Sequence, residues 1–131
     1  MSIRWKLTAL RVVTGLGTVP VATAMMVRCE GEENVGELFS EAREGNGPID
    51  AACKAIAAIT GVPLEVFFDI HAEGNGSNST ARIRATVTHK GRIIPAEIRH
   101  SDIVMGAVEA YLAILNAVLL PSKELVVAEV R

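Results

Sequence analysis

The feature that most constrains the fold is an order of segments that occurs twice along the chain. In each half, three segments with strand-like patterns precede one segment whose apolar residues recur at helical spacing. The segment 80–88 alternates most clearly, because Ala81, Ile83, Ala85 and Val87 share one face while Arg and Thr residues occupy the other. The expected strands are residues 6–13, 20–28 and 36–42 in the first half and 64–72, 80–88 and 92–98 in the second.

The first expected helix follows the segment Gly45-Asn46-Gly47. Pro48 suits its first turn, where a missing N–H costs nothing, and Asp50 lies where the helix dipole favours an acid. Gly61 and Pro63 are expected to end this helix. Its expected apolar positions are Ile49, Ala52, Cys53, Ile56 and Ile59.

The second expected helix opens at Ser101-Asp102, a cap residue followed by an acid, and Pro121 stops it. Small residues on one of its faces would let another backbone approach closely. These small residues are Gly106, Ala110, Ala113 and Ala117, and the apolar stripe consists of Val104, Val108, Tyr111, Leu115 and Val118.

These segments predict an α+β fold of two βββα units related by pseudo-two-fold symmetry, with Asp50 and Asp102 in equivalent places. The expected units are residues 5–61 and 62–121 of a single domain, 1–131, in which 122–131 form a C-terminal tail. One helix covers only part of a three-stranded sheet, so we expect the sheets to be completed by dimerisation. The order argues against sensors of the ACT type, whose units run strand-helix-strand.

Composition excludes several classes of partner. Half of the residues are hydrophobic but only 4% are aromatic, so the core must be built from Ala, Val, Ile and Leu. A formal charge of −2 does not suggest binding to nucleic acid or to an anionic membrane. The chain begins without a signal-peptide pattern and has no uncharged apolar run of about 18 residues, so we expect a cytoplasmic protein.

No set of residues indicates catalysis, a metal site or a cofactor. Cys29 and Cys53 are expected to be buried free thiols. His71, His89 and His100 lack metal-ligand spacing and are interpreted as surface or strand-end residues. We therefore expect a chain that is not an enzyme.

The segment Gly45–Ala51 is the most informative element. Glycines at a strand-to-helix junction expose backbone N–H groups at a helix N-terminus, which can bind a carboxylate. The apolar side chains that follow would suit the alkyl group of a branched amino acid. The alternative is a plain tight turn that caps a helix.

This segment, Gly-Asn-Gly-Pro-Ile-Asp-Ala, resembles the C-terminal regulatory domain of α-isopropylmalate and citramalate synthases. Trp5-Lys6-Leu7-Thr8 and Ser101-Asp102-Ile103-Val104 match the same family, and the resemblance covers roughly residues 5–119. It implies a homodimer that binds leucine or isoleucine as a feedback effector and inhibits a separate catalytic barrel. This chain lacks that barrel and is expected to act on a catalytic synthase partner.

The resemblance also implies which residues bind the effector. Gly45 would present its backbone, and the other positions would line the alkyl slot. Leu64 or Val66, and then Phe68 and Ala72, would fall along the fourth strand. The full set is Gly45, Gly47, Ile49, Leu64, Val66, Phe68, Ala72, Ser79 and Ile98.

Two other functions stay open. The chain could be a structural dimerisation subunit of a synthase that has lost effector binding. It could also be an independent enzyme that uses Cys53 or His100, although nothing in the spacing supports this.

Overall fold

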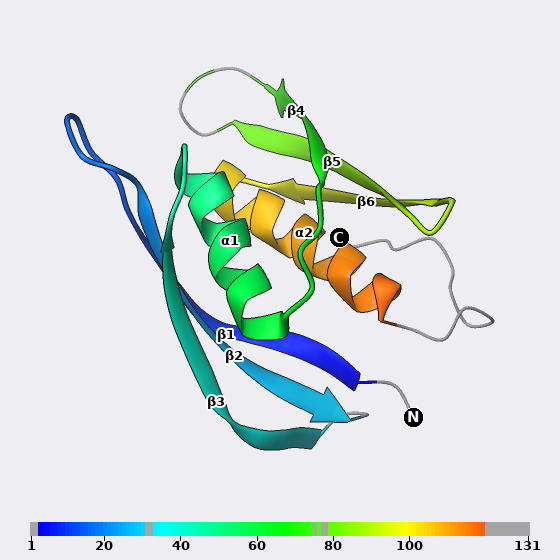
Figure 1. The fold of residues 1–131 in the computed structure, drawn as a ribbon. Helices are drawn as coiled ribbons and strands as arrows, with labels where there is room; N and C mark the ends of the chain where they lie inside the picture. The colour runs from blue at the N-terminus through cyan, green and yellow to red at the C-terminus, as the bar shows by residue number, and fades with distance from the viewer. Residues whose placement is uncertain (1–2, 31–32, 75, 77–78, 120–131) are drawn as a thin grey trace. The chain divides into compact units, whose positions relative to one another are not determined.

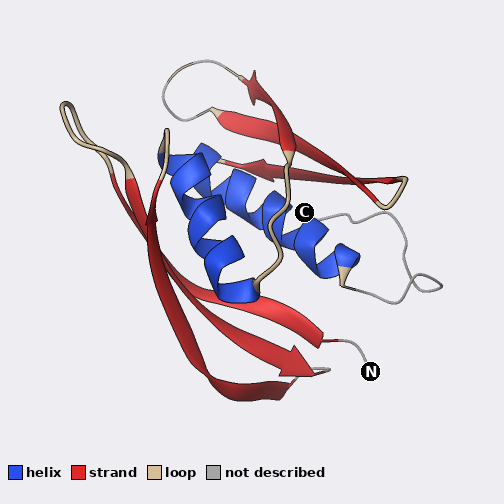
Figure 2. Ribbon diagram, in the orientation of Figure 1, coloured by secondary structure: helices blue, strands red, loops and turns tan. Residues whose placement is uncertain are grey.

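The computed structural model describes residues 3–30, 33–74, 76 and 79–119. They form two compact units that divide between Pro63 and Leu64. Each unit is a three-stranded antiparallel sheet followed by one helix, so the expected βββα order in both halves is confirmed (Figures 1 and 2). The elements are β1 (Ile3–Val13), β2 (Val21–Glu30), β3 (Glu33–Glu44), α1 (Pro48–Thr60), β4 (Phe67–Glu73), β5 (Thr80–His89), β6 (Arg92–His100) and α2 (Ile103–Val118).

In the first unit, β2 is the central strand of sheet A and pairs with β1 on one side and β3 on the other. Helix α1 packs on the inner face of this sheet, mainly over β2 and β3. Ala22, Ala24 and Met26 of β2 are fully buried there. Small side chains on both surfaces let the helix approach the sheet closely.

In the second unit, β5 is the central strand of sheet B, and α2 packs over β5 and β6. The predicted inward face of β5 is confirmed, because Ala81, Ile83, Ala85 and Val87 are all buried. The predicted close approach on α2 occurs at Gly106, where an added Cβ would lie 2.9 Å from the Cβ of His100. The helix therefore needs a glycine at this crossing.

Three details differ from the sequence-based expectation. Strand β4 begins at Phe67, because its pairing with β5 starts at Phe67↔Thr86 and the residues before it have no strand partner. Strand-favouring composition without a partner does not make a strand. The N-cap of α2 is Asp102 rather than Ser101, since the Asp102 carboxylate accepts from the N–H groups of Val104 and Met105.

The buried face of α1 is also shifted from the predicted stripe. Ala52 and Ile56 are buried as expected, whereas Ile49, Cys53 and Ile59 are only half-buried. The buried face consists mainly of alanines, and their small side chains let the helix pack close to the sheet. The fully buried residues of this helix are Ala51, Ala52, Ala55 and Ile56.

Both cysteines are free thiols, as expected, but only Cys29 is buried; the expected burial of Cys53 is wrong, because it is half-buried on α1. Gly61 ends α1 in the left-handed conformation, as predicted. Pro121 and the expected tail, 122–131, lie outside the described residues.

Candidate effector site at the start of helix α1

Gly45 connects β3 to the first turn of α1 and has no room for a side chain. An added Cβ would lie 2.7 Å from the Cα of Ala51 and 2.8 Å from Oδ2 of Asp50. The N–H of Gly45 donates to the carbonyl of Pro20 at 3.1 Å. The fold itself therefore requires glycine here, and the N–H of this residue is already used within the first unit.

Gly47 has a different role, because it is the N-cap of α1 and has no side chain to cap the helix. Its carbonyl accepts from the N–H of Ala51 at 2.9 Å, and Pro48 occupies the first helical position. Within the described part of the chain, no hydrogen bond is made by the N–H groups of Ile49 and Asp50. Two backbone donors at the positive end of the helix are thus free to bind an anion.

Asp50 organises the same turn from the side. Its Oδ2 accepts from the N–H of Asn46 at 2.8 Å and pairs with Nζ of Lys54 at 2.9 Å. The Asn46 hydrogen bond, and then the Lys54 bond, lower the pKa of the Asp50 carboxyl below its ordinary value. Asp50 is therefore ionised at neutral pH and holds the junction in one conformation.

Sequence reasoning missed the parts played by Asn46 and Lys54. The spacing of Asp50 and Lys54, four residues apart on a helix, is a signal that could have identified this ion pair. The bond from Asn46 depends on the turn geometry and has no comparable sequence signal.

Three of the predicted effector residues lie on the inner face of sheet B. Phe68 pairs with Ala85 and Ala72 pairs with Ala81, whose side chains face α2. Because α2 packs over β5 and β6, Phe68 stays half-buried and Ala72 exposed on the edge strand β4. Ile98 lies two strands away on the same face and is only 2% exposed.

Ile70, which sequence reasoning did not select, lies on this face between Phe68 and Ala72. Leu64 and Val66 lie in the connection that precedes β4. The expectation that this part of the chain belongs to the fourth strand is therefore wrong. Ser79 lies directly before β5, and its hydroxyl donates to the carbonyl of Gly76 at 2.7 Å. Three of the predicted effector residues thus belong to the first unit and six to the second.

The residues considered for an independent enzyme are poorly placed for catalysis. Burial, and then the nearby Asp50 carboxylate, raise the pKa of the Cys53 thiol to about 12, so it is protonated at neutral pH. His100 ends β6, where its Nδ1 accepts from the N–H of Asp102 at 2.8 Å and its Nε2 lies 3.1 Å from Glu109. These contacts tie the start and the body of α2 to the sheet.

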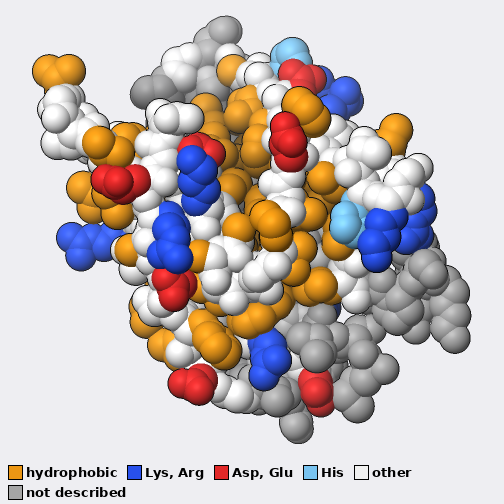
Figure 3. Space-filling model, in the orientation of Figure 1, with side chains coloured by type: hydrophobic (Ala, Val, Ile, Leu, Met, Phe, Trp, Pro, Cys, Tyr) orange, Lys and Arg blue, Asp and Glu red, His pale blue; other side chains and the backbone are white. Residues whose placement is uncertain are grey.

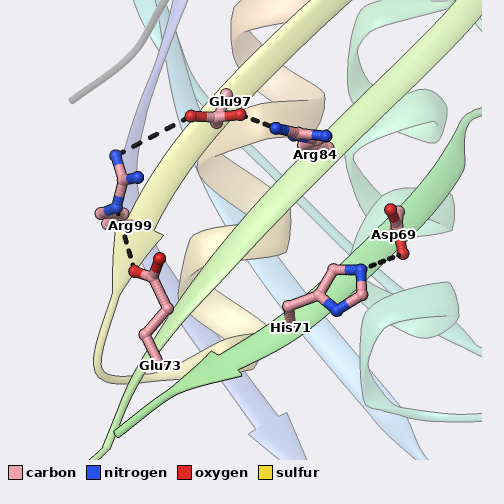
Figure 4. Close-up of polar contacts among 6 residues, drawn as sticks. All are labelled: Asp69, His71, Glu73, Arg84, Glu97 and Arg99. Atoms are coloured by element: carbon pink, nitrogen blue, oxygen red, sulfur yellow. Dashed lines mark hydrogen bonds and ion pairs between the residues drawn. The ribbon is translucent and has the colours of Figure 1, made fainter.

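The remaining charged cluster lies on the outer face of sheet B (Figure 4). Glu97 lies between two arginines, 2.7 Å from Nε of Arg84 and 3.8 Å from Arg99, and Arg99 also bonds Glu73 at 3.0 Å. The hydrogen bond between Arg84 and Glu97 raises the pKa of Arg84 and lowers that of Glu97. His71 and Asp69 form a separate contact at 3.0 Å.

Neither a metal site nor a membrane span is found in the described ranges. No group of three or more His, Cys, Asp or Glu side chains gathers there in a way that could hold a metal ion. No helix among these residues has both the length and the hydropathy needed to cross a bilayer.

Comparison with known proteins gives a consistent result. Residues 1–119 match the family model described as the LeuA allosteric (dimerisation) domain. The chain is 32% identical over 120 residues to a 2-isopropylmalate synthase of Chromobacterium violaceum, covering 91% of this chain and 22% of that protein. It is 36% identical over 101 residues to a 2-isopropylmalate synthase of Salmonella paratyphi A, covering 76% of this chain and 18% of that protein.

The chain therefore spans about a fifth of the length of the curated relatives that it matches. The activity in their names belongs to those whole proteins. Because the family model matches nearly the whole chain, this protein belongs to the LeuA allosteric (dimerisation) domain family.

Proposed function

We propose that this chain is a non-catalytic regulatory module that dimerises and gives feedback control of a 2-isopropylmalate-synthase-type enzyme in the cytoplasm. Its effector in this proposal is a branched-chain amino acid, leucine or isoleucine. Family membership and the names of the relatives support the regulatory role. The observation that carries effector binding is the uncapped first turn of α1.

The first turn of α1 matches the polar end of an amino acid. The free N–H groups of Ile49 and Asp50 would bind the α-carboxylate, where the helix dipole favours negative charge. The ionised Asp50 side chain in the same turn offers a negative partner for the α-ammonium, shared with Lys54. The first turn of α1 would thus supply donors for the carboxylate of an amino acid and an acceptor for its ammonium group.

The alkyl group of the effector would contact the half-buried side chain of Ile49, which adjoins the carboxylate-binding groups. Burying a leucine side chain is worth about 1.5–3 kcal/mol, enough to separate leucine from a small amino acid such as alanine by more than tenfold. The parts that Leu64, Val66, Phe68, Ala72, Ser79 and Ile98 would play stay predictions drawn from the resemblance.

Isothermal titration calorimetry of the chain with leucine, isoleucine, valine and alanine tests this proposal. We expect binding of at least one branched amino acid at millimolar concentration or below, and weaker binding of alanine. No heat with any of them at millimolar concentration would refute effector binding.

A matched pair of variants separates a local contact from a general effect on the helix. Ile49 and Ile59 are both half-buried on α1, at opposite ends of the helix. Ile49→Asn should raise the effector Kd about tenfold or more, because it removes an apolar contact next to the carboxylate site. Ile59→Asn should leave the effector Kd unchanged, and equal losses in both variants would contradict the proposed position.

A structural dimerisation module without an effector is the second candidate. Gly45 favours it, because the close contact with Ala51 explains this glycine without any ligand. A chain that dimerises, binds no amino acid and co-purifies with a catalytic synthase chain would establish this function instead.

A further inference from the structure

The side chain of Asn46 is exposed and takes no part in the contacts that build the start of α1. Asn46 connects β3 to α1 together with Gly45 and Gly47. Its backbone N–H is held by Asp50 at 2.8 Å, whereas its side-chain amide makes no hydrogen bond in the part of the chain that the structure describes. Directly before a glycine, an amide that is free in this way is open to reaction with the backbone that follows it.

An asparagine that precedes a glycine is thermolabile, because the next backbone nitrogen can displace its side-chain amide. That nitrogen, once solvent hydroxide has removed its proton, attacks Cγ of the asparagine and closes a succinimide ring. The side-chain nitrogen takes up a proton and leaves as ammonia. Water then adds to either carbonyl of the ring and opens it to aspartate or isoaspartate. Asparagine and water thus become an acid and ammonia, without oxidation or reduction.

The backbone at Gly47 leaves the attacking nitrogen accessible. An added Cβ at Gly47 would meet nothing within 4 Å, and its backbone is extended, with φ −167°. Among the described residues, the N–H of Gly47 has no acceptor. Figure 3, in the orientation of Figure 1, shows the start of α1 at the surface of the molecule, with charged side chains beside it. Neither of the two reacting groups therefore has to break a contact within this part of the chain.

The other asparagines of the chain are a comparison for Asn46. Asn116 lies inside α2, where helical hydrogen bonds engage the N–H of the next residue. Asn34 precedes the β-branched Val35, which hinders attack by its nitrogen. Asn75 and Asn78 lie outside the described residues, although Asn75 also precedes a glycine in the sequence. Of the asparagines in the described ranges, Asn46 alone precedes a glycine.

We propose that Asn46 is a site of spontaneous deamidation, and that its acidic products weaken effector binding at the start of α1. The chemical step is independent of the proposed effector, whereas its consequence rests on the proposed function. Aspartate at this position adds a negative charge to a turn that already holds the ionised Asp50 and that would receive the effector carboxylate.

The isoaspartate product acts on the backbone instead. It adds one main-chain carbon between Gly45 and Gly47. Gly45 is fixed on its other side, because its N–H donates to the carbonyl of Pro20 at 3.1 Å and it lies against Ala51. The added length must therefore displace Gly47, the N-cap of α1, and with it the donors of the first turn.

Peptide mapping by mass spectrometry tests the modification site. The folded chain and the same chain unfolded in urea are incubated at mildly alkaline pH and then digested with trypsin. Cleavage after Arg43, Lys54 and Arg82 places Asn46 in peptide 44–54 and Asn75 in peptide 55–82, so the two Asn-Gly segments are measured separately. We expect peptide 44–54 of the folded chain to gain the mass of an exchange of NH2 for OH, at a rate close to that in urea.

Two variants serve as controls for this measurement. Gly47→Ala keeps Asn46 but adds a methyl group beside the attacking nitrogen, so its mass gain should be severalfold slower. Asn46→Gln should show no gain, because its longer side chain would have to close a larger and slower ring. An intact Asn46 in the folded chain at a time when the unfolded chain has reacted overturns the site, and so do equal rates in wild type and Gly47→Ala.

Calorimetric titration with leucine tests the consequence. Asn46→Asp copies the aspartate product, and both Asn46→Asp and Asn46→Gln keep the backbone N–H that Asp50 binds. Asn46→Asp should raise the Kd for leucine roughly fivefold or more through the repulsion of one added charge. Asn46→Gln should leave this Kd within about twofold.

The outcomes keep the modification apart from the proposed function. Wild-type affinity in Asn46→Asp, or equal losses in both variants, overturns the effect of the added charge but not the modification site. If freshly purified wild type binds no branched amino acid, the proposed function fails together with this effect. The mass gain of peptide 44–54 still decides the modification site in that case.

Discussion

Replacing the glycine N-cap of α1 by aspartate, Gly47→Asp, would supply an intramolecular carboxylate to the site where the effector carboxylate is proposed to bind. The backbone of Gly47 is extended, with φ −167°, and an added Cβ would meet nothing within 4 Å, so the position accepts a side chain. An aspartate N-cap accepts from the second or third helical N–H, which are those of Ile49 and Asp50. The variant side chain would therefore occupy a donor that the effector needs.

The size of the effect follows from the bonds involved. A hydrogen bond to a charged group contributes about 1.5–3 kcal/mol, so losing one such bond to the effector should raise its Kd roughly 10- to 150-fold. The new cap should at the same time raise the free energy of unfolding by a few tenths of a kcal/mol. Loss of binding combined with equal or greater stability is an outcome that a damaged fold cannot produce.

The assay is calorimetric titration with leucine, together with thermal unfolding followed by circular dichroism. Gly47→Ala is the control, because it adds a methyl group without an acceptor and should keep the effector Kd within about twofold. Wild-type affinity in Gly47→Asp would refute the assignment of these N–H groups as the carboxylate site. Equal losses in both variants would show that the methyl group, rather than the carboxylate, blocks binding.

Four further outcomes are expected. Gly106→Val should lower the free energy of unfolding by about 1–3 kcal/mol or more in chemical denaturation, because its side chain would overlap Ile83. Asp102→Ala should cost about 1 kcal/mol in the same assay by removing the cap of α2, and Asp102→Asn should cost less. The pKa of the Asp50 carboxyl is lowered from 3.8 in the folded chain, so its small contribution to stability is present above that pH and is lost as the pH falls through the folded-state pKa. The difference in unfolding free energy between wild type and Asp50→Asn should therefore shrink on acidification below about pH 4. With a pKa of about 12, Cys53 should be thiolate in on the order of one molecule in ten thousand at pH 8, so iodoacetamide should label it only slowly until denaturant is added; rapid labelling of the native chain would contradict its protonated state.

The arrangement of strands and helices could be predicted from sequence because its signals are local. The alternation of residues 80–88 placed Ala81 and Ile83 on the buried face, where the structure has them. The same reasoning failed for residues 64–66, because a strand also needs a partner, and the partner strand begins its pairing only at Phe67. Which face of α1 is buried depends on how closely the helix approaches the sheet, and no local pattern records that distance.

The candidate site also has features that the sequence predicts and features that only the folded structure shows. That the segment Gly45–Ala51 starts a helix is visible in its proline, acid and glycines, and the structure has the helix begin at Pro48. The individual role of each glycine is not visible, because it depends on atoms that the fold brings near. Gly45 lies against the backbone of Ala51, a contact between residues six apart that no spacing rule predicts.

Gly45 and Gly47 meet different physical demands, and this difference decides which of the two bears on the proposed function. Gly45 is required by the contact with Ala51, so any protein with this junction needs it, whether or not it binds an effector. Gly47 is not required by sterics or by backbone conformation, and a capping side chain there would stabilise the helix. A residue that leaves two helix donors unsatisfied where aspartate or serine would fit has no explanation in stability. The proposed effector would supply one, because its carboxylate could use these donors only if the protein does not cap them itself.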